Sequence, residues 1–106
     1  MLLAFLLATS AHLWVPPGPS DAQLDKCGRI QGDIGMIGTY RDMGMPPKET
    51  LRKMRSFDPR AGTPFLKSAI NMVYFDRIAQ QMTPNELAHS VYSECTSTPP
   101  PWQPLK

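Results

Sequence analysis

Residues 82–95 read MTPNELAHSVYSEC, and the first half of this stretch has the features of a helix start. Thr83 and Glu86 have the spacing of a capping box, in which each side chain binds the backbone N–H of the other residue. Pro84 falls at the first helical position, where its missing N–H costs nothing and its fixed φ suits a helix. These signals predict a helix that begins at Pro84.

The apolar residues of the same stretch predict which face of that helix is buried. Met82 and Leu87 flank the cap at the spacing of a hydrophobic staple, which fixes how the chain enters the helix. The following apolar residues recur at i, i+3, i+4 and i+7, the period of one helical face: Ala88, Val91, Tyr92 and Cys95. The buried face therefore ends in a cysteine.

The chain has two cysteines, Cys27 and Cys95, which lie near opposite ends of the expected folded region. A disulfide between them closes a loop of roughly 70 residues, which the chain-entropy model values at about 4 kcal/mol. That is a large share of the 5–15 kcal/mol that is typical of a domain. The alternative is two unrelated buried thiols. The disulfide is favoured by what the N-terminus indicates about compartment.

The N-terminal segment has the composition of a signal peptide. Residues 1–15 are almost entirely apolar and carry no Lys, Arg, Asp or Glu, but the stretch is short for a bilayer span. No basic residue precedes it, so either the signal is atypical or translation starts upstream. Ser20 and Ala22 are small residues at −3 and −1 of a cleavage site before Gln23. We therefore expect a signal peptide over 1–22 and a periplasmic or secreted protein.

After that segment the chain has room for one compact domain, over 23–97, followed by a proline-rich tail over 98–106 that we expect to be disordered. Trp102 in this tail either packs back on the domain or serves as an exposed anchor. From Gln23 onward eleven basic residues stand against eight acidic ones. This mild excess, without aromatic-interleaved basic runs, does not indicate nucleic-acid binding.

Apolar periodicity and Pro or Gly boundaries predict an all-α fold, a small four-helix bundle with helices near 24–42, 47–57, 64–80 and 84–97. A glycine stripe accompanies the apolar face of the first helix: Gly28, Gly32, Gly35 and Gly38. It indicates close packing against another helix. The alternative, a phosphate-binding loop, matches neither glycine-rich pattern. Gly44 suits a left-handed residue after the helix end, and the disulfide predicts that the first and last helices are antiparallel.

Two candidate partner-binding surfaces follow from the helix faces. On the second helix the face opposite the apolar residues carries three cations at i, i+4 and i+7: Lys48, Arg52 and Arg55. It is either a solvated face or a docking surface for an anionic partner or a lipid headgroup layer. On the third helix three residues widen an already broad apolar face: Phe65, Met72 and Phe75. This surplus is either core of a central helix or a surface for a partner.

The sequence offers no catalytic set. His89 is the one histidine after the leader, and its nearby acid, Glu86, is used by the capping box. It has no companion His or Cys at zinc spacing, and no serine lies in an elbow motif. We expect a surface histidine, no catalytic residues, no metal and no cofactor.

Three short motifs resemble a pattern in small uncharacterised exported proteins of proteobacteria. The first, RDMGM over 41–45, ends the first cysteine helix as Arg-x-x-Gly. The others start the last helix as Thr-Pro-x-Glu, at Thr83, and end it as Tyr-x-x-Cys, at Tyr92. The resemblance carries caps and cysteines but no function. In size, helical content and one long-range cysteine pair, the chain is also similar in architecture to the HdeA-type periplasmic acid-stress chaperones.

The absence of a catalytic set and the surplus of apolar residues predict a non-enzymatic, exported module that binds a protein partner, a class that includes inhibitors and immunity-type proteins. The identity of the partner and the oligomeric state do not follow from the sequence. The alternative function is a stress chaperone of the HdeA type, which would release monomers and protect clients at low pH.

Overall fold

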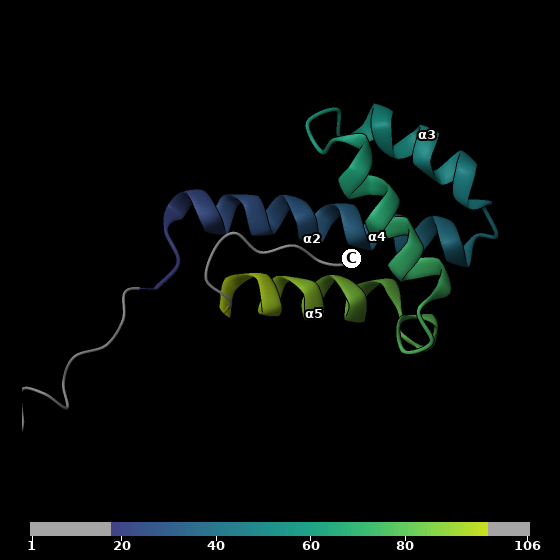
Figure 1. Ribbon diagram of the computed structural model, residues 1–106. Coiled ribbons are helices and arrows are strands. Elements are labelled where there is room, and N and C mark those ends of the chain that lie inside the picture. Colours follow the sequence, from purple (N-terminus) through teal and green to yellow (C-terminus); the bar gives the residue numbers. More distant parts are fainter. Residues whose placement is uncertain (1–17, 98–106) are drawn as a thin grey trace, which may run out of the picture.

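The computed structural model describes residues 18–97, and this part of the chain is helical. It confirms the all-α, four-helix fold, with one additional short 3-10 helix (Figure 1). The elements in chain order are α2 (Asp21–Asp42), α3 (Pro47–Phe57), α4 (Thr63–Phe75), η1 (Ala79–Gln81) and α5 (Pro84–Ser97). α2 and α5 lie side by side, whereas α3 and α5 lie on opposite sides of the molecule (Figure 1).

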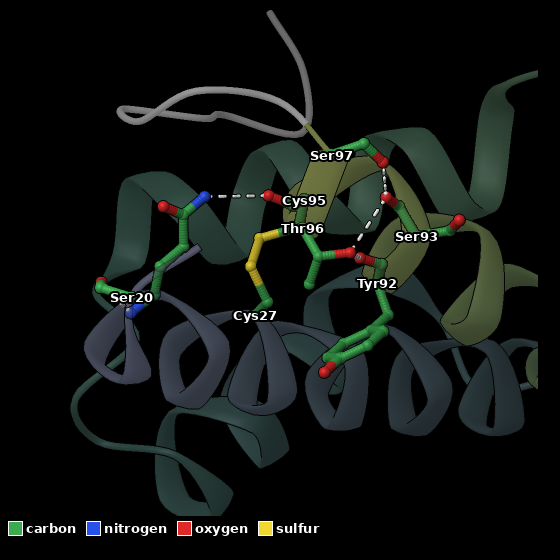
Figure 2. Close-up of a disulfide and its surroundings, with 8 residues drawn as sticks. Ser20, Cys27, Tyr92, Ser93, Cys95, Thr96 and Ser97 are labelled. Atoms are coloured by element: carbon green, nitrogen blue, oxygen red, sulfur yellow. Dashed lines mark hydrogen bonds between the residues drawn. A yellow bond between two sulfur atoms is a disulfide. The ribbon is translucent and has the colours of Figure 1, made fainter. Parts of the chain in front are cut away.

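The predicted disulfide between Cys27 and Cys95 joins the first turns of α2 to the end of α5 (Figure 2). The two Cα atoms are 5.7 Å apart, within the usual range for a bonded pair. Both cysteines are buried. The amide Nε2 of Gln23 donates to the carbonyl oxygen of Cys95 at 3.1 Å, so a hydrogen bond ties the same two helix ends together. α2 and α5 are therefore antiparallel, as predicted.

The glycines of α2 let α5 approach closely at two of the four positions. A Cβ built on Gly38 would lie 3.1 Å from the Cα of Pro84, and one built on Gly35 would lie 3.5 Å from the Cβ of Ala88. A Cβ on Gly28 or Gly32 would meet nothing within 4 Å. The packing interpretation thus holds for the second half of the stripe.

The helix caps explain most of the boundaries. The expected capping box of α5 is present: Thr83 N–H donates to Glu86 Oε1 at 2.9 Å, and Glu86 N–H donates to Thr83 Oγ1 at 3.1 Å. Gly44 has φ +84°, and α2 ends there with the two backbone hydrogen bonds of a Schellman motif. α2 starts at Asp21, three residues before the expected start, because the hydroxyl of Ser20 accepts from Gln23 N–H at 3.1 Å.

The third helix is shorter than predicted. The sequence predicts it over 64–80, but α4 ends at Phe75 and a turn leads into η1. The cause is Asp76, whose Oδ2 accepts from the backbone N–H groups of Ile78 and Ala79 at 3.1 and 2.9 Å. A short acidic side chain that binds the backbone just ahead of it competes with continuation of the helix.

α3 is held against α4 and the preceding loop by a short polar chain. The hydroxyl of Tyr74 donates to the carbonyl of Met45 at 2.7 Å, and the hydroxyl of Thr50 lies 2.6 Å from that of Tyr74. Since the Tyr74 proton is used on Met45, Thr50 is the donor to Tyr74. Thr50 and Met54 are the fully buried side chains of α3, which leaves the other side of this helix outside the core.

The buried residues form one core, to which all four helices and η1 contribute. It comprises Cys27, Ile30, Ile34, Ile37, Met54, Leu66, Ala69, Ile70, Val73, Ala79, Leu87, Val91 and Cys95. Most of the expected signal peptide, 1–17, and the whole tail, 98–106 with Trp102, lie outside the described residues. The expected cleavage before Gln23 would fall in the first turn of α2; this boundary stays a prediction.

The two kinds of glycine environment give a matched test of the packing. Gly32→Ala should raise the free energy of unfolding by about 1 kcal/mol, because the new methyl group has open space and helix propensity improves. Gly38→Ala should lower it, because the backbone of Pro84 would have to move away. Urea denaturation of both variants measures the difference. Equal gains at both positions would mean that α5 does not pack closely on Gly38.

Candidate functional site

Arg41, in the last turn of α2, joins three segments that follow it in the chain. Its Nη1 donates to the carbonyls of Val73 and Ala79 at 3.0 and 2.9 Å, and its Nη2 donates to the carbonyl of Met82 at 2.7 Å. Its Nε donates to the carboxylate of the neighbouring Asp42 at 2.9 Å. One guanidinium therefore binds carbonyls in α4, in η1 and just before the cap of α5.

Sequence reasoning placed Arg41 near a helix end but assigned it no role. Its three carbonyl acceptors are 32 to 41 residues away in the chain, so no local spacing could have identified them. The geometry makes Arg41 a structural residue rather than a catalytic one, because its donors are used on the protein itself.

A second polar group missed by the sequence analysis lies between α2 and the end of α3. Asp33 is 3 % exposed, and its carboxyl shares a hydrogen bond with the carboxyl of Asp58. Burial, followed by the hydrogen bond and the negative charge of Asp58, raises the pKa of Asp33 from 3.8 to about 7; Arg29 and Arg60 oppose this shift. A buried carboxyl group whose pKa is raised towards 7 beside a second carboxyl is a feature of some catalytic sites.

Catalysis by this pair is not supported by its surroundings. Asp33 and Asp58 are both buried, and neither lines the two surface hollows of the α4, η1 and α5 region. The backbone N–H of Arg60 donates to Asp58 at 3.3 Å, as in a turn that follows a helix. The pair instead joins α2 to the α3–α4 turn and makes that contact dependent on a proton.

The structure separates the six residues predicted to bind a partner. Lys48, Arg52 and Arg55 are exposed together on α3. Phe65 and Met72 are half-buried and pack against the core, so most of the surplus apolar surface of α4 is core. Phe75 is 62 % exposed. The exposed residues of the predicted surfaces are therefore the cations of α3 and Phe75 at the end of α4, whereas Phe65 and Met72 keep only part of their surface exposed.

An apolar surface does occur where α4 ends. Phe75 and Ile78 are 62 % and 73 % exposed, and Ile78 lines a groove of about 110 Å³ between α4, η1 and α5. The apolar members of the groove are Met72, Ile78, Ala79, Met82, Leu87 and Val91, and its polar members are Asp76, Ser90 and Glu94. We call Phe75 together with these nine residues the junction surface.

The junction surface suits a side chain of a macromolecule better than a cofactor. The groove is smaller than the 300–1,000 Å³ of typical small-molecule sites. An adjoining hollow of about 390 Å³ is lined by four exposed residues, Asp76, Arg77, Ile78 and Gln81, which do not enclose a ligand. Asp76 and Glu94 place two carboxylates beside the apolar groove, so a basic or neutral partner surface would be preferred.

A third helix over 64–80, as predicted, would have carried Ile78 on its inward apolar face, one turn after Tyr74. Because α4 ends at Phe75, Ile78 follows a turn and points to solvent. His89 is exposed on α5, as expected. Among residues 18–97 no three His, Cys, Asp or Glu side chains are grouped as metal ligands, and no helix of that region is long and apolar enough to cross a bilayer.

The Arg41 contacts lead to a stability prediction. Arg41→Gln should lower the free energy of unfolding by about 3 kcal/mol, because charge-assisted hydrogen bonds to partly buried carbonyls are lost. Arg52→Ala, which removes an exposed cation, should change it by less than about 0.5 kcal/mol. Chemical denaturation with matched slopes compares the two variants. A loss for Arg41→Gln as small as the control would mean that the three carbonyls do not need Arg41.

The Asp33 carboxyl leads to a prediction about pH. The unfolded chain releases this proton near pH 4 and the folded chain near pH 7, so raising the pH through this window favours unfolding. The contribution of the protonated Asp33 carboxyl to the free energy of unfolding is complete below about pH 4 and is lost above about pH 7. The protein should be about 2 to 3 kcal/mol more stable at pH 5 than at pH 8.

The matched variants for this experiment are Asp33→Asn, which should remove most of the difference between the two pH values, and Glu94→Gln, which should leave it intact. Denaturation at both pH values measures the effect. Equal stability of the unmodified protein at pH 5 and pH 8 would show that Asp33 is already ionised in the folded state at pH 5.

Comparison with known proteins adds no family to these observations: no protein-family model matches the chain, and searches of curated proteins and of solved structures found no match.

Proposed function

We propose that this protein is an exported, non-enzymatic module that binds a protein partner through the junction surface. The observation that carries the proposal is the exposure of Ile78 in the lining of an apolar groove, together with the exposure of Phe75 at the end of α4, one residue before Asp76 of the same groove. Large apolar side chains that are contiguous with a groove mark interaction sites on small domains more often than isolated exposed residues do. Inhibitors and immunity-type proteins belong to this class.

The chemistry of the surface specifies the kind of partner. The groove has room for one apolar side chain, and Ile78 extends its apolar lining outward. Asp76 and Glu94 lie at the same groove, so a partner with a basic residue next to an apolar anchor would match both features. Aromatic and aliphatic anchors that fill a pocket carry most of the energy in such contacts.

Export is supported by the disulfide and by the composition of residues 1–15. The disulfide joins two cysteines that are 68 positions apart in the sequence. Disulfides are typical of oxidising compartments, where they form and persist. The small size of the domain fits the same interpretation, because small exported domains often need a covalent crosslink to remain folded.

The alternative, a stress chaperone of the HdeA type, has less support. Such a protein must loosen in acid to release monomers and expose client-binding surface. Here the carboxyl pair of Asp33 and Asp58 acts in the opposite direction, because the contact between α2 and the α3–α4 turn becomes stronger as the pH falls from about 7 towards 4.

Site-specific photocrosslinking in the native cells tests the proposal. A photoreactive amino acid in place of Ile78 should give one discrete protein adduct, whereas the same group in place of His89, exposed on the outer side of α5, should give none. Phe75→Ser in the Ile78 derivative should lower the adduct yield about tenfold, the size of one lost anchor contact. Adducts of equal yield at both positions, or none at either, would contradict binding at the junction surface.

A further inference from the structure

The charges of this protein are segregated along the chain. Residues 46–67, which form α3 and the start of α4, contain six basic and two acidic residues, whereas the rest of the described chain contains four basic and seven acidic ones. One of the two acids in the basic segment, Asp58, is buried. The cations of α3 and of the turn that follows it are all exposed: Lys48, Arg52, Lys53, Arg55 and Arg60.

Most of these cations contribute little to the stability of the fold. The exceptions are Arg52 and Arg60, and the Nε of Arg60 lies 3.9 Å from a carboxylate oxygen of Asp58. Lys48 and Arg52 are four residues apart and Arg52 and Arg55 are three apart, so like charges face each other on one side of the helix, which is unfavourable in isolation. Glu49 is the one acid of α3, and its carboxylate lies 3.6 Å from a guanidinium nitrogen of Arg52. The other exposed cations of α3 have no ion pair in the described structure.

The position of α3 leaves this charge free to meet another surface. α3 contacts α4 and α2 through the stripe that contains Thr50 and Met54, and its outer side is uncovered (Figure 1). Lys48, Arg52 and Arg55 occupy one flank of the outer side, and Lys53 lies on the other flank because it is about 100° from Arg52 around the helix axis. The cations therefore cover a broad convex face rather than a narrow line.

We propose that the outer face of α3 docks on a bilayer surface that is rich in anionic lipids. A layer of anionic headgroups is a continuous negative surface, so it offers phosphates to the cations on either flank of a convex face, whereas an acidic partner protein would need a concave surface to reach both. Thr50 and Met54 of α3 are packed inside the protein, and Phe57, which is 53 % exposed, is a single apolar side chain at the end of the helix. The contact is therefore mainly electrostatic and peripheral, without insertion of the helix.

This docking is compatible with the proposed function and independent of it. α5 and α3 lie on opposite sides of the molecule, so a protein held by α3 keeps its α5 side turned away from the bilayer (Figure 1). The two proposals use different residues and different assays, and either can fail without the other.

Vesicle co-sedimentation of the full chain, purified with its disulfide intact, tests the docking. Binding should occur with vesicles of equal parts phosphatidylglycerol and phosphatidylcholine and should be lost at about 0.5 M NaCl, where screening shortens the range of the charges. Vesicles of phosphatidylcholine alone measure any contribution from apolar residues such as those at 1–15. Binding to both kinds of vesicle with equal strength, or binding that salt does not weaken, would overturn the proposal.

Two double variants separate position from net charge. Lys48→Gln with Arg55→Gln should weaken binding to the anionic vesicles about 25-fold, since each basic residue near such a surface contributes roughly fivefold. Lys26→Gln with Arg77→Gln removes one exposed Lys and one exposed Arg elsewhere and should weaken it less than about threefold. Equal losses in the two variants would overturn the proposal. Retention of the protein by immobilised polyglutamate but not by anionic vesicles would also overturn it, in favour of an acidic protein partner.

Discussion

The packing of α2 against α5 is the constraint on which the other contacts depend. Cys27 is bonded to Cys95 at one end of this helix pair, and Gly38 meets Pro84 at the other. Eleven residues separate Cys27 from Gly38, and eleven separate Pro84 from Cys95, so the two helices stay in register over about 16 Å. α3, α4 and η1 therefore connect two helices, α2 and α5, that are already fixed to each other. The disulfide fixes one end of this pair, and steric fit fixes the other.

The fixed pair of helices also determines where the exposed apolar residues lie. Arg41, near the end of α2, binds carbonyls from α4, η1 and the segment before α5, and Asp76 ends α4 by binding the backbone ahead of it. In a continued helix Ile78 would have joined the inward face. Because the chain turns at Asp76 instead, Ile78 is exposed, and a groove forms between α4 and α5. The junction surface is thus a consequence of how α4 is terminated.

The parts of the fold that could be predicted from the sequence are those encoded by residues a few positions apart. The capping box of α5, the left-handed Gly44 and the shared helix face of the α3 cations are local patterns, and the structure contains all three. The end of α4 was not, because Asp76 resembles any exposed helical acid until its carboxylate is seen to bind the backbone. Arg41 and the Asp33–Asp58 pair depend on contacts between residues at least 25 positions apart, which only the folded chain brings together.

The candidate surfaces show the same difference between what local sequence patterns predict and what only the folded chain reveals. Helical period placed Lys48, Arg52 and Arg55 together because they share one helix face, and the structure keeps them together. Helical period alone could not distinguish Phe65, which packs against the core, from Phe75, which does not. That difference depends on which part of α4 is covered by neighbouring elements.

Neither the cationic face of α3 nor the exposed residues of the junction surface are needed to bury the core. This is the physical reason why both are candidates for function. The buried side chains of α3 are Thr50 and Met54, so the exposed cations on the rest of this helix add little packing, and only Arg52 among them has an acidic partner in the described structure, Glu49. Phe75 and Ile78 are left largely in water, where an apolar side chain adds little to stability. A small domain that depends on a disulfide has little stability to spare. A binding role would therefore explain why residues that add little to its stability are present on two separate surfaces.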